Sequence, residues 1–256
     1  MIKLERSERP DELTDDMVTE LTNKFLENPD ARVWDRSFVR EALMTFSHNK
    51  CCYCESKLNE ESKYLTVDHY YPKSQYPDKV ILWDNLLPAC NRCNSKKGAH
   101  DTCRVPIIDP TKNDPRRYLF IHLYHYKSRD NAADSLGRAT IDVLGLNDSN
   151  DMVVPRFKIG QAIQDKLNEL HNRIHTYSED NGDVRNRNRI VRIMTDMLRL
   201  ASPEKEFSAV AASAIFSNID YMRVKEKMKS ANLWSCELKR LEDISRSICL
   251  LEHCAD

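Results

Sequence analysis

The spacing of apolar residues predicts helices at both ends of the chain. Apolar side chains recur every three or four positions over residues 13–27 and again over residues 35–48, which is typical of two amphipathic helices. Thr14 is the expected N-cap of the first helix and Asp35 that of the second. The same spacing continues from about residue 130 to residue 253 and predicts a series of further helices.

Between these parts the apolar segments are short, as in β-strands. Residues 64–69 predict a strand that ends before Pro72, and residues 86–89 predict a second strand. Residues 91–98 then favour a helix, which Gly98 ends. The sequence therefore predicts an α+β fold that is mainly helical, with its strands confined to one small region.

The composition suits a soluble protein of one or two domains. The chain has 256 residues, of which 41% are hydrophobic and 31% charged, so it can bury a core. No segment approaches the roughly 18 apolar residues that cross a membrane. The first residues are charged where a secretory signal is apolar, so we expect a cytoplasmic protein without membrane contact. The net charge of −1 leaves nucleic acid open as a ligand, because local patches of charge decide such binding.

Four of the nine cysteines form two pairs with the spacing of metal ligands. A reducing cytoplasm disfavours disulfides, whereas a Cys-x-x-Cys turn directs both thiolates to one metal, and two such turns complete a tetrahedral zinc site. The expected ligands of a structural zinc are Cys51, Cys54, Cys90 and Cys93. Three nearby residues remain alternatives for one ligand, namely His48, Cys52 and Cys103. Buried or redox-active thiols without a metal are the alternative to a zinc site.

Polar residues suited to phosphodiester hydrolysis lie between and beside these pairs. Asp68 and His69 end the first predicted strand, Asn85 follows a loop, and Asn94 comes directly after the second cysteine pair. One hard divalent ion stabilises charge at the phosphate and at the leaving oxygen, and Asp68 and Asn94 offer two oxygen ligands for it. Neutral His69 can take the proton of the attacking water, because the reference pKa of histidine, about 6.5, is near working pH.

The neighbouring positions of Asp68 and His69 set a geometric condition. Neighbours on a regular strand point to opposite faces of the sheet. The strand must therefore end, twist or bulge at this point for both side chains to reach one site, and Pro72 favours an ending.

These motifs resemble the HNH (ββα-metal) endonucleases that have a zinc frame. The resemblance rests on the two cysteine pairs and on the segments Thr66-Val67-Asp68-His69, Asn85-Leu86-Leu87 and Cys93-Asn94. It implies that His69 is the general base and that Asp68 and Asn94 bind a catalytic Mg²⁺ or Mn²⁺ ion. It also implies that Asn85 steadies the loop and orients the base, and that the four cysteines hold structural Zn²⁺.

The resemblance extends to the helix after the second cysteine pair. The chain departs here from the HNH form that ends in histidine, because Asn94 takes that place. Lys97 follows Asn94 by three positions, which a helix puts on one side, and the resemblance implies that Lys97 lies near the phosphate. Lys96 is a second candidate for binding nucleic acid.

The whole chain resembles the HNH nuclease subunit of Septu-type and retron-associated anti-phage systems. The shared features are helices before Cys51, the segment Pro106-Ile107-Ile108-Asp109-Pro110 and a helical C-terminal half. This resemblance implies a nuclease that works with an ATPase partner and damages DNA during phage infection. We expect N-terminal helices over residues 1–48, a zinc-braced HNH nuclease core over 49–117, and an all-α half over 118–256 that docks the partner.

Two other functions remain open at this point. The chain can be a stand-alone, restriction-like HNH nuclease whose helical half recognises the target, or a non-catalytic zinc module that binds nucleic acid or protein. The complete polar set favours an enzyme, because a zinc module does not need it. Three arginines at helical spacing suit either a DNA backbone or a partner surface: Arg185, Arg189 and Arg192.

Overall fold

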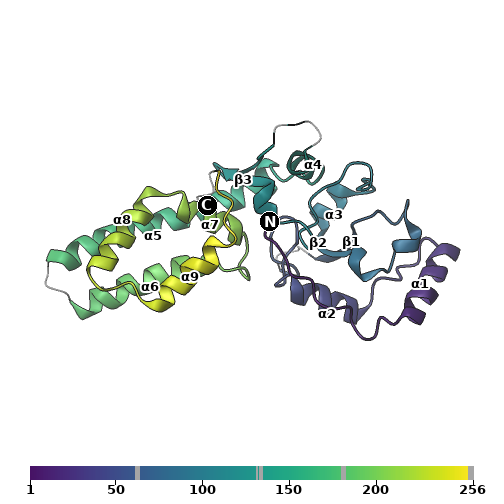
Figure 1. Cartoon of the computed structure of the whole chain (residues 1–256), viewed down its shortest axis with the longest axis horizontal. Coiled ribbons are helices and arrows are strands. Elements are labelled where there is room, and N and C mark those ends of the chain that lie inside the picture. Colours follow the sequence, from purple (N-terminus) through teal and green to yellow (C-terminus); the bar gives the residue numbers. More distant parts are fainter. Residues whose placement is uncertain (61–63, 131, 133–134, 180–182, 253–256) are drawn as a thin grey trace. The chain divides into compact units, whose positions relative to one another are not determined.

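The computed structural model describes residues 1–60, 64–130, 132, 135–179 and 183–252, which form two compact units (Figure 1). The first unit comprises Met1–Tyr118 with Lys127–Leu146, and the second comprises Leu119–Tyr126 with Asn147–Asp256. Helices dominate the chain, and the strands are few and short. The mainly helical α+β fold expected from the sequence is confirmed, and the division into three functional domains stays a prediction.

Two helices open the first unit. α1 (Asp15–Glu27) begins as predicted after Thr14, whose side-chain oxygen accepts a hydrogen bond from the first turn at 3.2 Å. α2 (Ser37–Phe46) has no side-chain cap, because Arg36 occupies the N-cap position. The expected cap at Asp35 is therefore wrong, since the Asp35 carboxylate binds arginine side chains instead.

The centre of this unit is a ββα core. β1 (Leu65–His69) pairs antiparallel with β2 (Leu86–Cys90), so that Leu65 lies opposite Cys90 and His69 opposite Leu86. α3 (Asn91–Lys97) follows β2 without a break. Gly98 ends α3 with a positive φ of 52°, a conformation that costs glycine little. The two strands and the helix agree with the sequence prediction to within one residue at their ends.

Short elements complete the first unit. Two 3-10 turns lie in the connection from β1 to β2: η1 (Pro77–Lys79) and η2 (Trp83–Asn85). After the core come η3 (Pro115–Arg117) and α4 (Leu136–Val143). The Arg92 guanidinium of α3 donates hydrogen bonds to the carbonyls of Leu144 and Gly145 at 3.2 and 2.7 Å, and so ties the end of α4 to the core.

Two strands that the sequence analysis missed follow η3 along the chain. β3 (Leu119–His122) and β4 (His125–Ser128) form a two-stranded sheet inside the half that was expected to be all-α. Each strand has only four residues, which is too short to show an alternating pattern. The description of residues 118–256 is corrected in this respect.

The remainder of the second unit is helical. Its elements are η4 (Ser149–Val153), α5 (Val154–Glu179), α6 (Val184–Leu200), α7 (Ser208–Phe216), α8 (Ile219–Ser230) and α9 (Cys236–Arg246). The apolar stripe of α5 is buried and consists of Ile163, Leu167, Leu170 and Ile174. Within the described ranges, no helix has both the length and the apolar character needed to span a membrane.

Candidate active site

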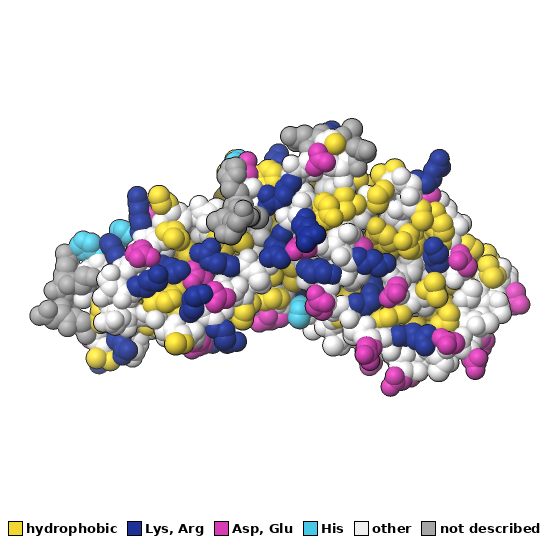
Figure 2. All heavy atoms as spheres, in the orientation of Figure 1, with side chains coloured by type: hydrophobic (Ala, Val, Ile, Leu, Met, Phe, Trp, Pro, Cys, Tyr) yellow, Lys and Arg dark blue, Asp and Glu magenta, His cyan; other side chains and the backbone are white. Residues whose placement is uncertain are grey.

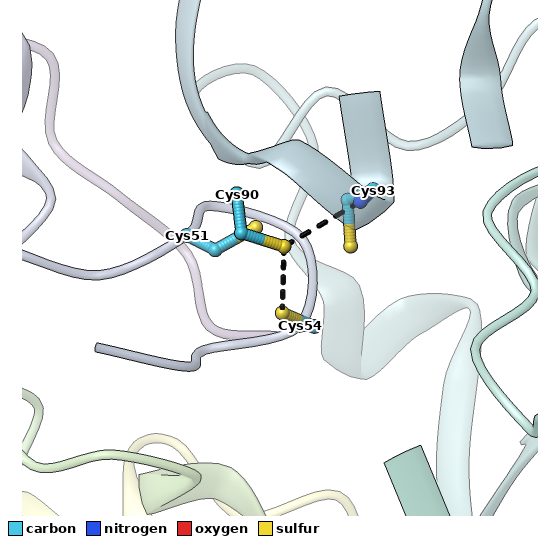
Figure 3. Close-up of side chains that lie close together, drawn as sticks. All are labelled: Cys51, Cys54, Cys90 and Cys93. Carbon is cyan, nitrogen blue, oxygen red and sulfur yellow. Dashed lines mark hydrogen bonds between the residues drawn. The ribbon is translucent and has the colours of Figure 1, made fainter. Parts of the chain in front are cut away.

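The four predicted zinc ligands converge on one point of the first unit (Figure 3). Two come from the turn before β1, one from the end of β2 and one from the first turn of α3. Their sulfur atoms all lie within 4.8 Å of one another, and the Sγ atoms of Cys54 and Cys90 are 3.7 Å apart. A tetrahedral zinc with Zn–S bonds of about 2.3 Å requires sulfur atoms about 3.8 Å apart. The donor set therefore fits zinc.

The thiols of the cysteine cluster have pKa values shifted in opposite directions. Burial raises the pKa of the Cys51 thiol well above its usual range, whereas hydrogen bonds from Cys51 and the other sulfurs lower the pKa of Cys90. A bound metal favours the deprotonated form of every thiol ligand. The three alternative ligands, His48, Cys52 and Cys103, are not members of the cluster.

Asp68 is buried at the end of β1 and both of its carboxylate oxygens are bound. Oδ2 accepts a hydrogen bond from the Tyr53 hydroxyl at 2.6 Å, and Oδ1 accepts one from Lys97 Nζ at 3.0 Å. Burial raises the pKa of Tyr53 well above its usual range, so this hydroxyl stays protonated and remains a donor. These contacts hold the carboxylate in one orientation.

Lys97 offsets the free-energy cost of burying the Asp68 carboxylate. The side chain of Lys97 is 0% exposed, and its ammonium also donates a hydrogen bond to the backbone carbonyl of His69 at 2.6 Å. A buried charge is strongly destabilising unless it is paired and hydrogen-bonded. The expected contact of Lys97 with a phosphate does not agree with this burial, whereas Lys96 is exposed on α3.

His69 is oriented through one ring nitrogen. Its Nε2 lies 2.9 Å from the carbonyl oxygen of Val80. Because a carbonyl can only accept, Nε2 carries the proton of the neutral ring and Nδ1 is left as the proton acceptor. Burial lowers the pKa of His69 to about 4, so the ring is neutral at pH 7. Trp34 packs edge-on against the imidazole with ring centroids 4.7 Å apart.

Asn85 is buried and fastens the loop that follows β1. Its Oδ1 accepts the backbone N–H of Tyr71 at 2.7 Å. Its Nδ2 donates to the carbonyls of Tyr71 and Lys79, at 3.2 and 2.8 Å. Lys79 immediately precedes Val80, whose carbonyl holds His69. These contacts are those expected of a residue that steadies the loop.

Three of the predicted site residues line one cavity of about 420 Å³, namely Asp68, His69 and Asn94. Asp68 and His69 both line it although they are neighbours in β1, whose last residue is His69. Asn85 and Lys97 are not among the lining residues.

The same cavity contains residues that the sequence analysis did not connect with it. The charged and aromatic ones are Arg32, Trp34, Asp35, Arg40 and Lys73. Four of them lie more than ten positions before the first cysteine of the cluster, and no motif marks them. Only the tertiary structure brings them to the site.

The ββα core, the cysteine cluster and the residues of the cavity together define an HNH endonuclease. The family model for HNH endonucleases matches residues 51–100. Over nearly the whole chain, the protein is similar to the Septu protein PtuB of Bacillus thuringiensis, with 38% identity over 94% of this chain and 92% of that protein. The chain therefore belongs to the PtuB family of Septu proteins.

A second relative comes from a different kind of system. The chain is 26% identical to the retron Vc95 putative HNH endonuclease of Vibrio cholerae, over 68% of this chain and 89% of that protein. The resemblance to nucleases of Septu and retron systems that the sequence motifs indicated is thus confirmed.

The cysteine cluster generates a prediction about stability. Cys90→Ser is expected to abolish zinc binding and to lower the free energy of unfolding by about 5 kcal/mol or more, because binding of a structural zinc contributes to folding. Metal analysis and urea denaturation measure both effects. Cys236→Ser, which removes an exposed cysteine in α9, is the matched control and should change neither. Folded wild-type protein that contains no zinc would contradict the assignment.

The buried imidazole generates a prediction about pH. Between pH 4 and about 6.5 the unfolded chain binds a proton at His69 that the folded chain does not, so this residue makes stability increase with pH. Its contribution is present in full above about pH 6.5 and is lost as the pH falls to about 4. We expect His69→Gln to flatten the difference in unfolding free energy between pH 7 and pH 5. An equal pH dependence in both proteins would show that the folded ring titrates normally.

Proposed function

We propose that the protein is a metal-dependent endonuclease that hydrolyses phosphodiester bonds of DNA and acts as the effector nuclease of an anti-phage defence complex with an ATPase partner. The observation that carries the proposal is one cavity, lined by Asp68, His69 and Asn94, within an HNH segment. A zinc module without activity has no need for a neutral buried histidine beside a carboxylate.

His69 is the general base in this proposal. Its Nδ1 takes a proton from the water that attacks phosphorus, while the bond from Nε2 to Val80 keeps the ring in the required tautomer. Asn85 acts indirectly, because it fixes the loop whose carbonyl orients the ring. Trp34 limits rotation of the imidazole from its other side.

Asp68 and Asn94 are the proposed ligands of a Mg²⁺ or Mn²⁺ ion. Both offer oxygen atoms, which hard divalent cations prefer, and both line the cavity. When bound, the ion stabilises negative charge at the phosphate and at the leaving oxygen. The hydrogen bonds from Tyr53 and Lys97 hold the Asp68 carboxylate in one orientation. Lys97 thus acts through Asp68, and Lys96 on the exposed side of α3 is the proposed contact to nucleic acid.

The partner proposal rests on the relatives and on the second unit. Relatives named for Septu and retron systems support a defence role. The sequence contains no Gly-rich phosphate loop, so an energy-dependent switch must come from another protein. The helices of the second unit bury apolar side chains between them. Many Lys, Arg, Asp and Glu side chains lie on the surface of the molecule (Figure 2). The exposed charged residues of α6 include Arg185, Arg189 and Arg192.

The catalytic assignment predicts which changes abolish cutting. His69→Ala should lower the rate of plasmid cleavage by about 10²–10⁴-fold while zinc content stays unchanged. Asp68→Ala and Asn94→Ala should also increase the concentration of Mg²⁺ or Mn²⁺ needed for cutting. His171→Ala, which removes an exposed histidine of α5, is the control and should cut normally. Full activity of His69→Ala, or wild-type cutting without any divalent ion, would refute the mechanism.

The partner model predicts a stable complex. Co-expression with the product of the neighbouring gene, which this model expects to be an ATPase, should give one species in size-exclusion chromatography with light scattering, and DNA cutting by it should depend on nucleotide. The nuclease alone serves as the control for both measurements. If the two proteins migrate separately at micromolar concentration and the nuclease alone is fully active, the stand-alone restriction-like nuclease is the better description.

A further inference from the structure

We propose that Arg32 and Arg40 bind the phosphate backbone of DNA at the catalytic cavity. Both residues lie outside the segment that matches the HNH family, and no motif assigns them a role. The inference rests on the proposed function, because it assumes that a DNA strand enters the cavity that contains His69.

The position of the two arginines is the first argument. Arg32 comes from the connection between α1 and α2, Arg40 comes from α2, and both line the cavity together with Asp68 and His69. The same connection contributes Trp34, which packs against the imidazole of His69. The segment that contains the arginines is therefore in contact with the proposed base, so its charges act close to the reacting phosphate.

The arginines are held in place by one shared carboxylate. Asp35 Oδ2 lies 3.1 Å from Arg32 Nη2, and Asp35 Oδ1 lies 2.9 Å from Arg40 Nη1. Each guanidinium has five N–H donors and uses one nitrogen for Asp35, which leaves donors for a second anion. A guanidinium with fixed orientation suits a phosphate, because two parallel hydrogen bonds can form.

Stability does not account for this cluster. The side chains of Arg32, Asp35 and Arg40 are 69%, 31% and 35% exposed. Ion pairs at such sites contribute only about 0.2–1 kcal/mol. Asp35 does not cap α2 either, since Arg36 occupies that position. A contact with a ligand explains why two arginines are directed to one aspartate beside the cavity.

The balance of charge supports an anionic ligand. Lys97 neutralises Asp68, and Asp35 neutralises only one of its two arginines. Lys73 adds a further positive charge, with its Nζ 5.0 Å from the centroid of the Trp34 ring. The lining therefore has a surplus of positive charge before any metal binds, and such a surplus attracts phosphate.

The size of the cavity indicates which part of DNA the arginines contact. A cavity of about 420 Å³ accepts one or two backbone phosphates and not the bases of a duplex. When the bond to be cut lies at His69, Arg32 and Arg40 in the same lining can contact that phosphate or its neighbours on the strand. Contacts of this kind carry no sequence information, so the contribution of the arginines is the same for every sequence.

Binding without cutting tests the proposal. In the full chain with His69→Ala, affinity for a short fluorescent DNA duplex is measured by anisotropy over a series of salt concentrations. Arg32→Ala and Arg40→Ala should each weaken binding about tenfold at low salt, for two different duplex sequences alike. Each should also reduce the slope of log affinity against log salt by about one.

A matched arginine serves as the control for loss of charge. Arg223 pairs with Asp220 three positions away at 3.3 Å and is 62% exposed, much as Arg32 pairs with Asp35, but it does not line the cavity. Arg223→Ala should leave affinity and salt slope unchanged. An equal loss of affinity in Arg223→Ala and Arg32→Ala would overturn the proposal, because net charge alone would explain both.

Asp35→Asn separates direct contact from a structural role. This variant keeps both positive charges and loses only the carboxylate that orients them, so affinity at low salt should fall clearly less than in Arg40→Ala. A loss as large as that of Arg40→Ala would mean that the cluster only supports the fold, and would overturn the proposal. Wild-type protein that never cuts DNA but shows arginine-dependent binding would refute the proposed function alone. Normal binding and cutting by both arginine variants would refute this inference alone.

Discussion

The burial of a carboxylate against a lysine is the interaction on which the site depends. Asp68 at the end of β1 and Lys97 at the end of α3 are both removed from water, and their charges compensate each other at 3.0 Å. Removing one partner of such a pair typically costs about 3–5 kcal/mol, because the other charge is left buried and unpaired. The pair therefore fixes α3 against β1, and with α3 it fixes Asn94 beside Asp68.

The other contacts each hold a different part of the site around this pair. The cysteine cluster joins the turn before β1 to the junction of β2 and α3. Asn85 fixes the loop that carries the carbonyl bound to His69. Trp34 extends the site to the N-terminal helices. The nuclease motif thus provides the chemistry, and residues before the motif form part of the surface that a substrate meets.

Local patterns in the sequence were sufficient for part of this picture. The cysteine pairs predicted their own cluster because metal ligation imposes a fixed spacing, and the periodic helices were found because one face of each must be buried. Asp35 and Lys97 show where such reasoning ends. An aspartate before a helix satisfies the rule for a cap, and a lysine one helical turn after Asn94 suggests a contact with the phosphate. Instead Asp35 pairs with Arg32 and Arg40, close to it in sequence, and Lys97 pairs with Asp68, which is distant in sequence.

The hydrogen bonds that orient His69 and fasten its loop are made to main-chain atoms. The sequence of this loop can therefore diverge among such nucleases. Val80, Tyr71 and Lys79 take part through backbone carbonyl or amide groups that every residue type except proline provides in full. Substitutions in this loop can therefore accumulate without disturbing the imidazole, provided that its length and backbone path are kept. Natural variation in the loop is free to alter which nucleic acids approach the site while the hydrolytic step itself is inherited unchanged.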